Sequence, residues 1–281
     1  MLLKGKKILV TGVLTPQSLA FGIAEAAQKE GAEIILTGFG RALSLTQRSA
    51  KRLDPVPEVL ELDVTNPDHF TQLTRSLQEK VGILHGVLHA VAFAPEDALG
   101  GNFLKTPWES VATAFRISTF SLKELAVACM PLMKDGGAIV TLDFDNRVAW
   151  PIYDWMGVCK AGLEATVRYL ARDLGRHNIR VNALAAGPLT TMAAKSIPGF
   201  AVLERNWTKQ APLGWAARNH HDFVSKSAVA LLSDYFPSTT GEMVHVDGGY
   251  HAIGAAPVEA FAEEDAAAAA AAGSDEGKGA S

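Results

Sequence analysis

Tyr153 and Lys160 carry a phenol and an ammonium that could act on the same bound molecule. They lie in a segment that predicts the first turns of a long helix, where seven residues make about two turns and place both groups on one face, roughly 10 Å apart along the axis. A phenol can donate a hydrogen bond to an oxygen, and an ammonium offers three donors and a positive charge. One ligand lying along this face could contact both. Taken singly, Tyr153 could be a packing residue at a helix start and Lys160 a solvated or interface lysine.

Strand-length apolar runs alternate with helical patterns from residue 6 to about residue 247, and the pair follows the fifth of these runs. Some runs are continuously apolar, as Ile8-Leu9-Val10 is, which is typical of parallel strands buried on both faces. The alternation predicts an α/β fold, a doubly wound seven-stranded parallel sheet with helices on both faces. Strands are expected at 7–11, 33–37, 58–62, 86–92, 138–142, 180–184 and 242–246, and helices at 18–31, 67–81, 107–134, 153–177 and 222–235. Gly31, Gly136 and Gly175 fall where glycine C-caps are expected.

The end of the first predicted strand has the features of an anion-binding turn. Gly12 would let the backbone approach a pyrophosphate, and Ser18 could cap the following helix, whose N-terminal amides favour anions. The full GxGxxG pattern is absent, because Ser18 and Ala20 stand where further glycines would be. A plain glycine turn before a capped helix explains the same residues.

The ends of the next two predicted strands offer groups for an adenosine. Phe39 could stack on an adenine or its ribose, and Arg41 could stack or meet a 2′-phosphate. No acidic residue stands at this point to hold ribose hydroxyls, so the residues alone leave NADH and NADPH both open. Asp63 could accept from the adenine amino group, or be a solvated loop aspartate.

Composition excludes several classes of protein. The 281 residues carry a net charge of −4, of which residues 257–281 contribute −5, so the remainder is +1 and has no basic stripe for nucleic acid. No apolar run approaches the ~20 residues of a membrane span, and no signal peptide is visible, so a cytoplasmic protein is expected. Cys129 and Cys159 are expected to be buried reduced thiols, and no cysteine spacing suits a metal.

The chain is expected to form a single domain over residues 1–254. Residues 255–281 are acidic and rich in alanine, with seven consecutive alanines at 266–272. Such a segment buries too little apolar surface to offset its ordering entropy, so a disordered tail is predicted.

The sequence resembles the NADH-dependent enoyl-acyl carrier protein reductases of bacterial type II fatty acid synthesis, in the short-chain dehydrogenase/reductase superfamily. It looks similar above all to the actinobacterial and mycobacterial branch, from residue 1 to about 252. Many relatives in the superfamily place tyrosine four residues before lysine, where Met156 stands here; the longer spacing is typical of enoyl reductases. The motifs that carry the resemblance are Gly12-x5-Ser18-x-Ala20, Thr37-Gly38-Phe39, Leu62-Asp63-Val64, Asp143-Phe144-Asp145, Tyr153-x6-Lys160, Ala186-Gly187-Pro188 and His245-Val246-Asp247-Gly248-Gly249.

The resemblance implies a Rossmann-type fold and the reduction of the trans-2 double bond of an enoyl thioester carried by acyl carrier protein. Tyr153 would stabilise the developing enolate, and Lys160 would hold the nicotinamide ribose. The implied cofactor-binding residues are Gly12, Ser18, Leu19, Ala20, Phe39, Asp63, Val64, Ala90, Val91, Ala92, Lys160, Gly187, Leu189 and Thr191. The implied substrate-binding residues are Phe144, Tyr153, Met156, Ala193, Ala194 and Ile197.

A substrate-binding loop is expected at about 191–210, and its length is similar to the shorter loops of the family. A short wall would bury little of a long acyl chain, which favours short to medium substrates. The resemblance also implies a homotetramer, built through the helices expected at 107–134 and 153–177.

One departure from the family keeps other functions open. Where relatives commonly have Ser-Ile-Gly beside the nicotinamide, this sequence has Ala90-Val91-Ala92. A carbonyl (3-oxoacyl-type) reductase is one alternative, although the strand exit at Leu142-Asp143-Phe144 lacks the serine that such enzymes generally need. A non-enzymatic cofactor-binding paralogue is the other, since a fold does not fix a function.

Overall fold

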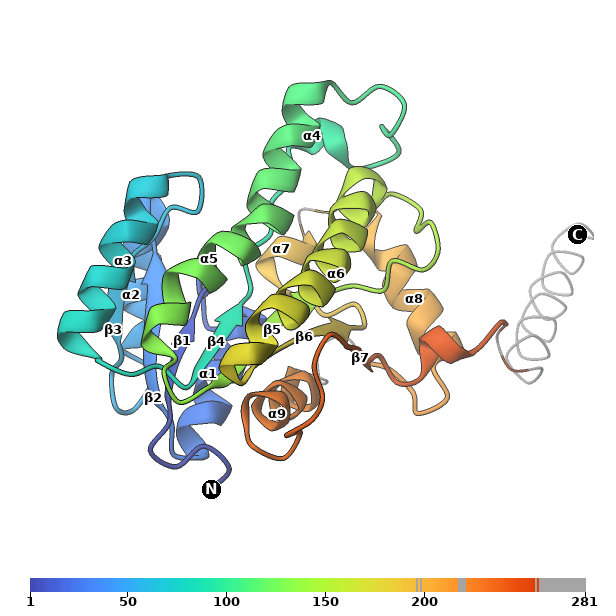
Figure 1. Ribbon diagram of the computed structural model, residues 1–281. Coiled ribbons are helices and arrows are strands. Elements are labelled where there is room, and N and C mark those ends of the chain that lie inside the picture. Colours follow the sequence, from blue (N-terminus) through green and yellow to red (C-terminus); the bar gives the residue numbers. More distant parts are fainter. Residues whose placement is uncertain (196, 198, 217–220, 256, 258–281) are drawn as a thin grey trace, which may run out of the picture.

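The computed structural model describes residues 1–195, 197, 199–216, 221–255 and 257. Its centre is a seven-stranded parallel sheet with the order β3-β2-β1-β4-β5-β6-β7, which confirms the predicted fold (Figure 1). The strands are β1 (Lys7–Val10), β2 (Glu33–Gly38), β3 (Glu58–Glu61), β4 (Gly86–His89), β5 (Gly137–Asp143), β6 (Ile179–Ala186) and β7 (Met243–Val246). The predicted tail lies outside the described residues, apart from Ala255 and Pro257.

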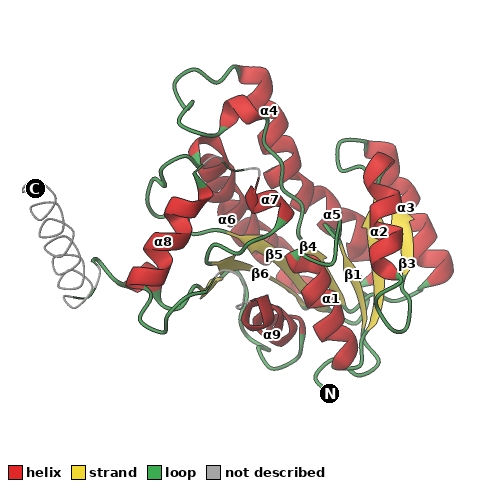
Figure 2. Ribbon diagram, turned by 180° about the vertical axis from the view of Figure 1, so that it is seen from behind, coloured by secondary structure: helices red, strands yellow, loops and turns green. Residues whose placement is uncertain are grey.

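Helices cover both faces of the sheet, and alternate strand residues explain why (Figure 2). Ile8 and Val10 pack into one core, whereas Leu9 packs into the other, and all three are fully buried. The first core includes residues of α1 (Leu19–Lys29), α2 (Gly40–Ala50) and α9 (His221–Leu232). The second includes residues of α3 (Pro67–Lys80), α5 (Ser121–Cys129) and α6 (Asp154–Leu174). Both cysteines are buried free thiols.

The helix predicted over 107–134 has a more complex form. It comprises α4 (Trp108–Phe115), a π-helical turn η2 (Arg116–Phe120), α5 and a 3-10 turn η3 (Met130–Leu132). Thr119 in the π-helical turn donates to the Cys159 carbonyl, at 2.7 Å, so it contacts α6 directly. Pro131 lacks an amide proton and cannot continue the α-helical bonding, so α5 ends at Cys129.

Other predictions also differ from the structure, since the strand expected at 86–92 ends at His89. Helix α2 was not among the expected elements. Gly175 does not adopt the left-handed conformation of a glycine C-cap; a 3-10 turn η4 (Gly175–His177) continues α6, and Asn178 has the left-handed φ of 57° instead. Asparagine tolerates that conformation better than most residues. Gly31 and Gly136 do have positive φ values after their helices, as expected.

The switch point of the sheet lies between β1 and β4. Successive strands are added on one side of β1 as β2 and β3, and then on its other side from β4 to β7. Loops leaving the carboxyl ends of neighbouring strands on either side of such a switch point diverge and leave a crevice, where ligands bind in folds of this kind. In the part of the chain that the structure describes, no helix is long and apolar enough to cross a bilayer.

Candidate active site

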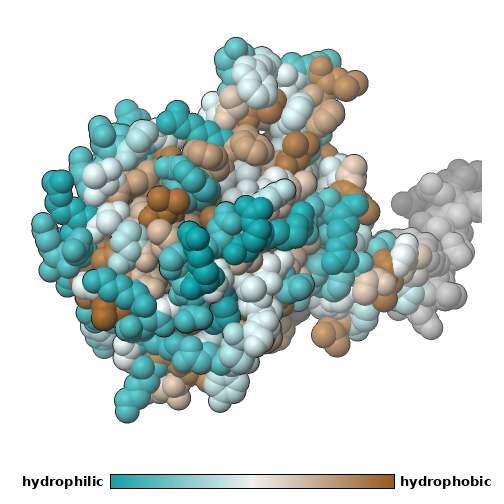
Figure 3. Space-filling view, in the orientation of Figure 1, coloured by the Kyte–Doolittle hydropathy of each residue, from teal (hydrophilic) through white to brown (hydrophobic). Residues whose placement is uncertain are grey.

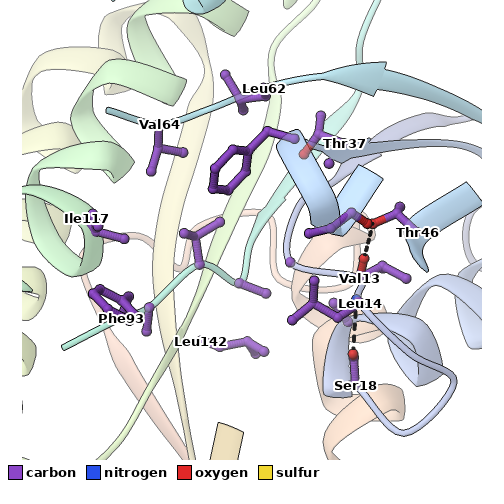
Figure 4. Close-up of a pocket in the computed structure, with 18 of the residues that line it drawn as sticks. Val13, Leu14, Ser18, Thr37, Thr46, Leu62, Val64, Phe93, Ile117 and Leu142 are labelled. Carbon is purple, nitrogen blue, oxygen red and sulfur yellow. Dashed lines mark hydrogen bonds between the residues drawn. The ribbon is translucent and has the colours of Figure 1, made fainter. Parts of the chain in front are cut away.

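A cavity of about 520 Å³ lies at the carboxyl ends of the strands around this switch point (Figure 4). It brings together most residues that the sequence assigned to the cofactor: Gly12, Ser18, Leu19, Ala20, Phe39, Asp63, Val64, Ala90, Val91, Ala92 and Thr191. Lys160, Gly187 and Leu189 are not on its wall. The wall has further residues that the sequence did not suggest for the cofactor: Val13, Leu14, Thr37, Gly38, Ala42, Thr46, Leu62, Thr65, Phe93, Ile117, Leu142 and Met192.

Gly12 and Ala90, which follow β1 and β4, approach each other closely at the cavity. Its φ of 83° is in the left-handed region, and a Cβ built on it would lie 2.0 Å from the carbonyl oxygen of Ala90. Ala90 is held in turn by its own amide, which donates to the Thr11 hydroxyl at 3.0 Å. Only glycine fits this position without moving a strand end. The missing side chain leaves a cradle of the type that lets backbone amides approach a phosphate.

Two sets of hydrogen bonds hold the loop after Gly12, one with Ser18 before α1 and one with α2. Ser18 accepts hydrogen bonds from the amides of Leu14 and Thr15, both at 3.1 Å. Ser18 is thus the N-cap residue of α1 by position, but its side chain makes no bond to the helix, so the predicted capping bond is wrong. On the other side, Thr46 of α2 donates to the Val13 carbonyl at 2.6 Å (Figure 4).

Ser49 adds a second hydrogen bond from α2 to this loop, since its hydroxyl donates to the carbonyl of Leu14 at 3.0 Å. Thr46 and Ser49 are three residues apart, so they share one face of α2. Both are buried despite their hydroxyls. Two small hydroxyl residues on the inward face of a helix are the sequence signal that could have identified this contact.

Phe39 and Asp63, two residues that the sequence suggested for an adenosine, both line the cavity. Phe39 is 46% exposed, so its ring face is accessible for stacking. Asp63 accepts from both the amide and the hydroxyl of Thr65 through Oδ1, at 2.8 and 2.7 Å. These bonds hold the Asp63 carboxylate in one orientation at the cavity wall.

Lys160 lies just behind the wall at the end of β5. Its ammonium donates to the carbonyl of Leu142, a wall residue, at 2.8 Å, and lies 3.8 Å from Oδ1 of Asp143. Burial lowers the pKa of the Lys160 ammonium, and the nearby Asp143 carboxylate opposes that change. Burial raises the pKa of Asp143 to about 6, against the lowering effect of Lys160. Burial therefore opposes the charged form of both groups, and their mutual attraction supports it.

Tyr153 is buried beside the cavity, in a cluster of apolar residues that we call the Tyr153 cluster, and is not on the cavity wall. Its ring centroid lies 5.0 Å from that of Phe144. Burial raises the pKa of the Tyr153 hydroxyl above its ordinary range, and Asp143 raises it further, so the hydroxyl is a proton-bearing donor. The cluster has the buried residues Leu99, Ala114, Tyr153, Met156 and Cys159, with Ala94, Phe144, Trp150 and Ile197 packed against them.

The Tyr153 cluster thus unites Phe144, Met156 and Ile197, three of the residues assigned to the substrate. Ala194 is buried in α7 (Met192–Lys195), and its amide donates to the Thr191 hydroxyl at 3.1 Å. Ala193 is in the same helix, where the structure describes its backbone only.

Aromatic residues that sequence reasoning missed extend this region. Trp150 and Trp207 contact Phe144, with ring centroids 5.5 and 5.6 Å away. Trp207 belongs to α8 (Phe200–Gln210) of the expected substrate-binding loop, stacks on Tyr250 at 3.8 Å, and is almost completely buried. The loop therefore contributes to the core as well as to the site.

The strand order, the glycine turn after β1 and the tyrosine–lysine pair at the start of α6 define a nucleotide-binding protein of the short-chain dehydrogenase/reductase class. Within that class the chain belongs to the enoyl-(acyl carrier protein) reductase family, whose sequence model matches residues 12–251. The family that the sequence motifs indicated is therefore confirmed.

Relatives in this family match almost their whole length. The enoyl-[acyl-carrier-protein] reductase [NADH] of Mycolicibacterium smegmatis is 43% identical over 262 residues, covering 88% of this chain and 97% of that protein. The protein of the same name from Mycobacterium avium is 41% identical over 261 residues, with the same coverage. An enoyl-[acyl-carrier-protein] reductase [NADH] from Bacillus cereus is 41% identical over 260 residues, covering 90% of this chain and 99% of its own.

Proposed function

We propose that this protein reduces the trans-2 double bond of enoyl thioesters carried by acyl carrier protein, with NADH as the reductant. The names of its relatives support this activity. The main structural support is the cavity at the β1–β4 switch point, with Lys160 beside it. The cradle at Gly12, which a Cβ would fill, suits the phosphates of a dinucleotide. When bound, NADH would supply the hydride that adds to Cβ of the enoyl thioester.

Tyr153 stabilises the charge that then develops on the thioester oxygen. A phenol keeps its proton at neutral pH, and burial raises the pKa of Tyr153 further, so the hydroxyl can donate a hydrogen bond to the enolate. One well-placed donor of this kind contributes roughly 3–4 kcal/mol to transition-state stabilisation. A proton from solvent then adds at Cα and completes the reduction.

Lys160 positions the cofactor rather than transferring a proton. One of its three donors is used by the Leu142 carbonyl and a second faces the Asp143 carboxylate, which leaves one for a ribose hydroxyl of a bound dinucleotide. Holding the ribose fixes the reductant against the double bond, which lowers the entropic part of the barrier.

The absorbance of NADH tests this proposal with crotonyl or octenoyl thioester and, separately, with acetoacetyl thioester. We expect oxidation with the enoyl substrates only, and a loss of roughly 10²–10³-fold in kcat for Tyr153→Phe. Lys160→Ala should lose activity as well. Tyr169→Phe is the matched control, since Tyr169 is on the same helix but 63% exposed. Oxidation with the ketone alone would indicate a carbonyl reductase, and none with either a non-enzymatic paralogue.

The short substrate-binding loop favours short to medium acyl chains. Leu203 and Trp207 of α8 are buried in the core, so this part of the loop leaves little wall for a long chain. Turnover of thioesters of about four, eight and sixteen carbons measures the preference. A rate that rises steeply toward the longest chain would contradict this expectation.

We further infer that the chain assembles as a homotetramer. Apolar side chains are exposed along the long helices, among them Trp108 at 72% and Phe120 at 47%, and brown side chains gather near the tip formed by α4 and the loop before it (Figure 3). Large exposed apolar patches typically mark protein interfaces. Light scattering should give about four times the chain mass of 29.8 kDa.

A further inference from the structure

The backbone on both sides of Tyr153 adopts an unfavourable conformation. Ile152 has a φ of 67° and Asp154 a φ of 44°, both in the left-handed region. A β-branched residue is a rare exception there, whereas aspartate tolerates it better. Such residues persist only where surrounding contacts hold them, and they concentrate at active sites.

The contacts that hold this turn come from the loop before α4. Oδ2 of Asp154 accepts hydrogen bonds from the amides of Gly101 and Asn102, at 2.6 and 3.0 Å. The Gly100 amide donates to the Ile152 carbonyl at 2.9 Å. Three consecutive amides of one loop therefore bind the residues on both sides of the tyrosine.

Two further contacts strengthen the same junction. The indole of Trp155 donates to the Phe103 carbonyl at 3.0 Å, and the two rings stack with centroids 4.8 Å apart. The side-chain amide of Asn102 donates to the Leu99 carbonyl at 2.7 Å, which closes the loop on itself. Leu99 packs with Tyr153 in the Tyr153 cluster, so the loop contacts both the backbone and the surroundings of the phenol.

On the basis of the proposed function, we propose that Asp154 is a positioning residue for Tyr153. Its carboxylate joins the 99–103 loop to the first turn of α6 and thereby fixes the direction in which the phenol projects. An acidic residue in the first turn of a helix commonly serves its own helix amides. Here one carboxylate oxygen instead accepts two amides more than fifty residues away in sequence.

Asp154 supplies an acceptor oxygen and tolerates a left-handed φ, and three substitutions separate these two properties. Asp154→Asn keeps an acceptor oxygen and tolerates the left-handed φ, Asp154→Gly keeps only the backbone freedom, and Asp154→Ala keeps neither. We expect kcat for enoyl reduction to fall about ten- to hundredfold in the glycine and alanine variants, because small displacements of a catalytic group are costly. The asparagine variant should restore most of the rate, and NADH affinity should stay unchanged in all three.

A double variant tests whether the effect passes through the phenol. In a Tyr153→Phe background, Asp154→Gly should lower kcat no further, since there is no hydroxyl left to position. Full additivity of the two losses would overturn the proposal, as would an asparagine variant as slow as the alanine variant.

A readout without turnover keeps this proposal separate from the proposed function. Protein labelled with 3-fluorotyrosine gives a ¹⁹F resonance for Tyr153, assigned from its absence in Tyr153→Phe. The resonance should shift in Asp154→Gly and Asp154→Ala but not in Asp154→Asn, and the Gly101 and Asn102 amides should exchange faster in the same two variants. An unchanged resonance and unchanged exchange would overturn the positioning role. If wild-type protein reduced no enoyl thioester, the proposed function alone would fail.

Discussion

His89, at the end of β4, should make the stability of this protein depend on pH below neutrality. Its ring is 1% exposed, with Nδ1 2.8 Å from the Thr141 hydroxyl and Nε2 2.8 Å from the Ser121 hydroxyl. Ser121 donates its own proton to the Ile117 carbonyl, so it accepts from Nε2–H, and Nδ1 is then the acceptor. The neutral ring satisfies both partners, and a second ring proton, on Nδ1, would require the Thr141 hydroxyl to turn its own proton away. Burial accordingly lowers the pKa of His89 to about 3, and Lys160 contributes in the same direction.

The difference between the pKa of His89 in the folded and the unfolded chain sets the direction and the size of the change in stability. Between the folded pKa of about 3 and the ordinary value of 6.5, the unfolded chain binds more protons at His89 than the folded chain does. The contribution of His89 is therefore fully present above pH 6.5 and is lost as the pH falls. From about pH 7 to about pH 5.5 the unfolded histidine becomes mostly protonated, which lowers the free energy of unfolding by about 1.2 kcal/mol.

Urea denaturation at these two pH values measures the effect against variants that cannot titrate. His89→Gln should be less stable than wild type at pH 7 by about 1–3 kcal/mol, because buried partners lose hydrogen bonds. At pH 5.5 the gap should shrink by about 1.2 kcal/mol. His89→Asn should make different hydrogen bonds and so differ in absolute stability. Its stability difference from wild type should nevertheless shrink by the same amount between pH 7 and pH 5.5. If the difference in stability between His89→Gln and wild type were the same at both pH values, or larger at pH 5.5, the lowered pKa of His89 in the folded protein would be contradicted.

Three other predictions concern the cofactor side of the site. Gly12→Ala should raise the dissociation constant of NADH at least tenfold in a fluorescence titration, because its Cβ would lie 2.0 Å from the Ala90 carbonyl oxygen; wild-type affinity would contradict the close approach. Thr46→Val should weaken NADH binding about five- to tenfold in the same assay, and Thr46→Ser should restore it, because the lost hydrogen bond is worth about 1 kcal/mol. Lys160→Met should lower stability by about 3–5 kcal/mol in urea, since it leaves the Asp143 carboxylate buried without its partner, and adding Asp143→Asn should recover much of the loss.

The sheet was predictable from sequence because its strands are buried on both faces. Continuous apolar runs such as Ile8-Leu9-Val10 have no other common explanation in an alternating α/β chain. The residues that leave these strands were predictable as cavity residues for the same reason, since parallel strands bring their carboxyl ends together.

The surroundings of the tyrosine were not predictable in this way. Its turn is held by amides of Gly101 and Asn102, and nothing local to Asp154 indicates a partner 53 residues away. Helix α2 was missed because it is polar overall, begins at Gly40 and has no side-chain cap, so neither a capping signal nor a wide apolar face was visible. The π-helical turn lies against α6, where Phe115 and Thr119 contact Gly162, and this contact between segments far apart in the sequence was not visible locally either.

The hydroxyls of Thr46 and Ser49 affect the conformational entropy that the loop loses when a ligand binds. Since they and Ser18 already hold Val13, Leu14 and Thr15 in one conformation, the loop loses little conformational freedom when a ligand arrives. Ser49 lies off the cavity wall, so a change there alters how readily the pocket accepts its occupant without touching it. Substitution of Ser49 thus offers a route to adjust affinity while leaving every residue of the cavity wall in place.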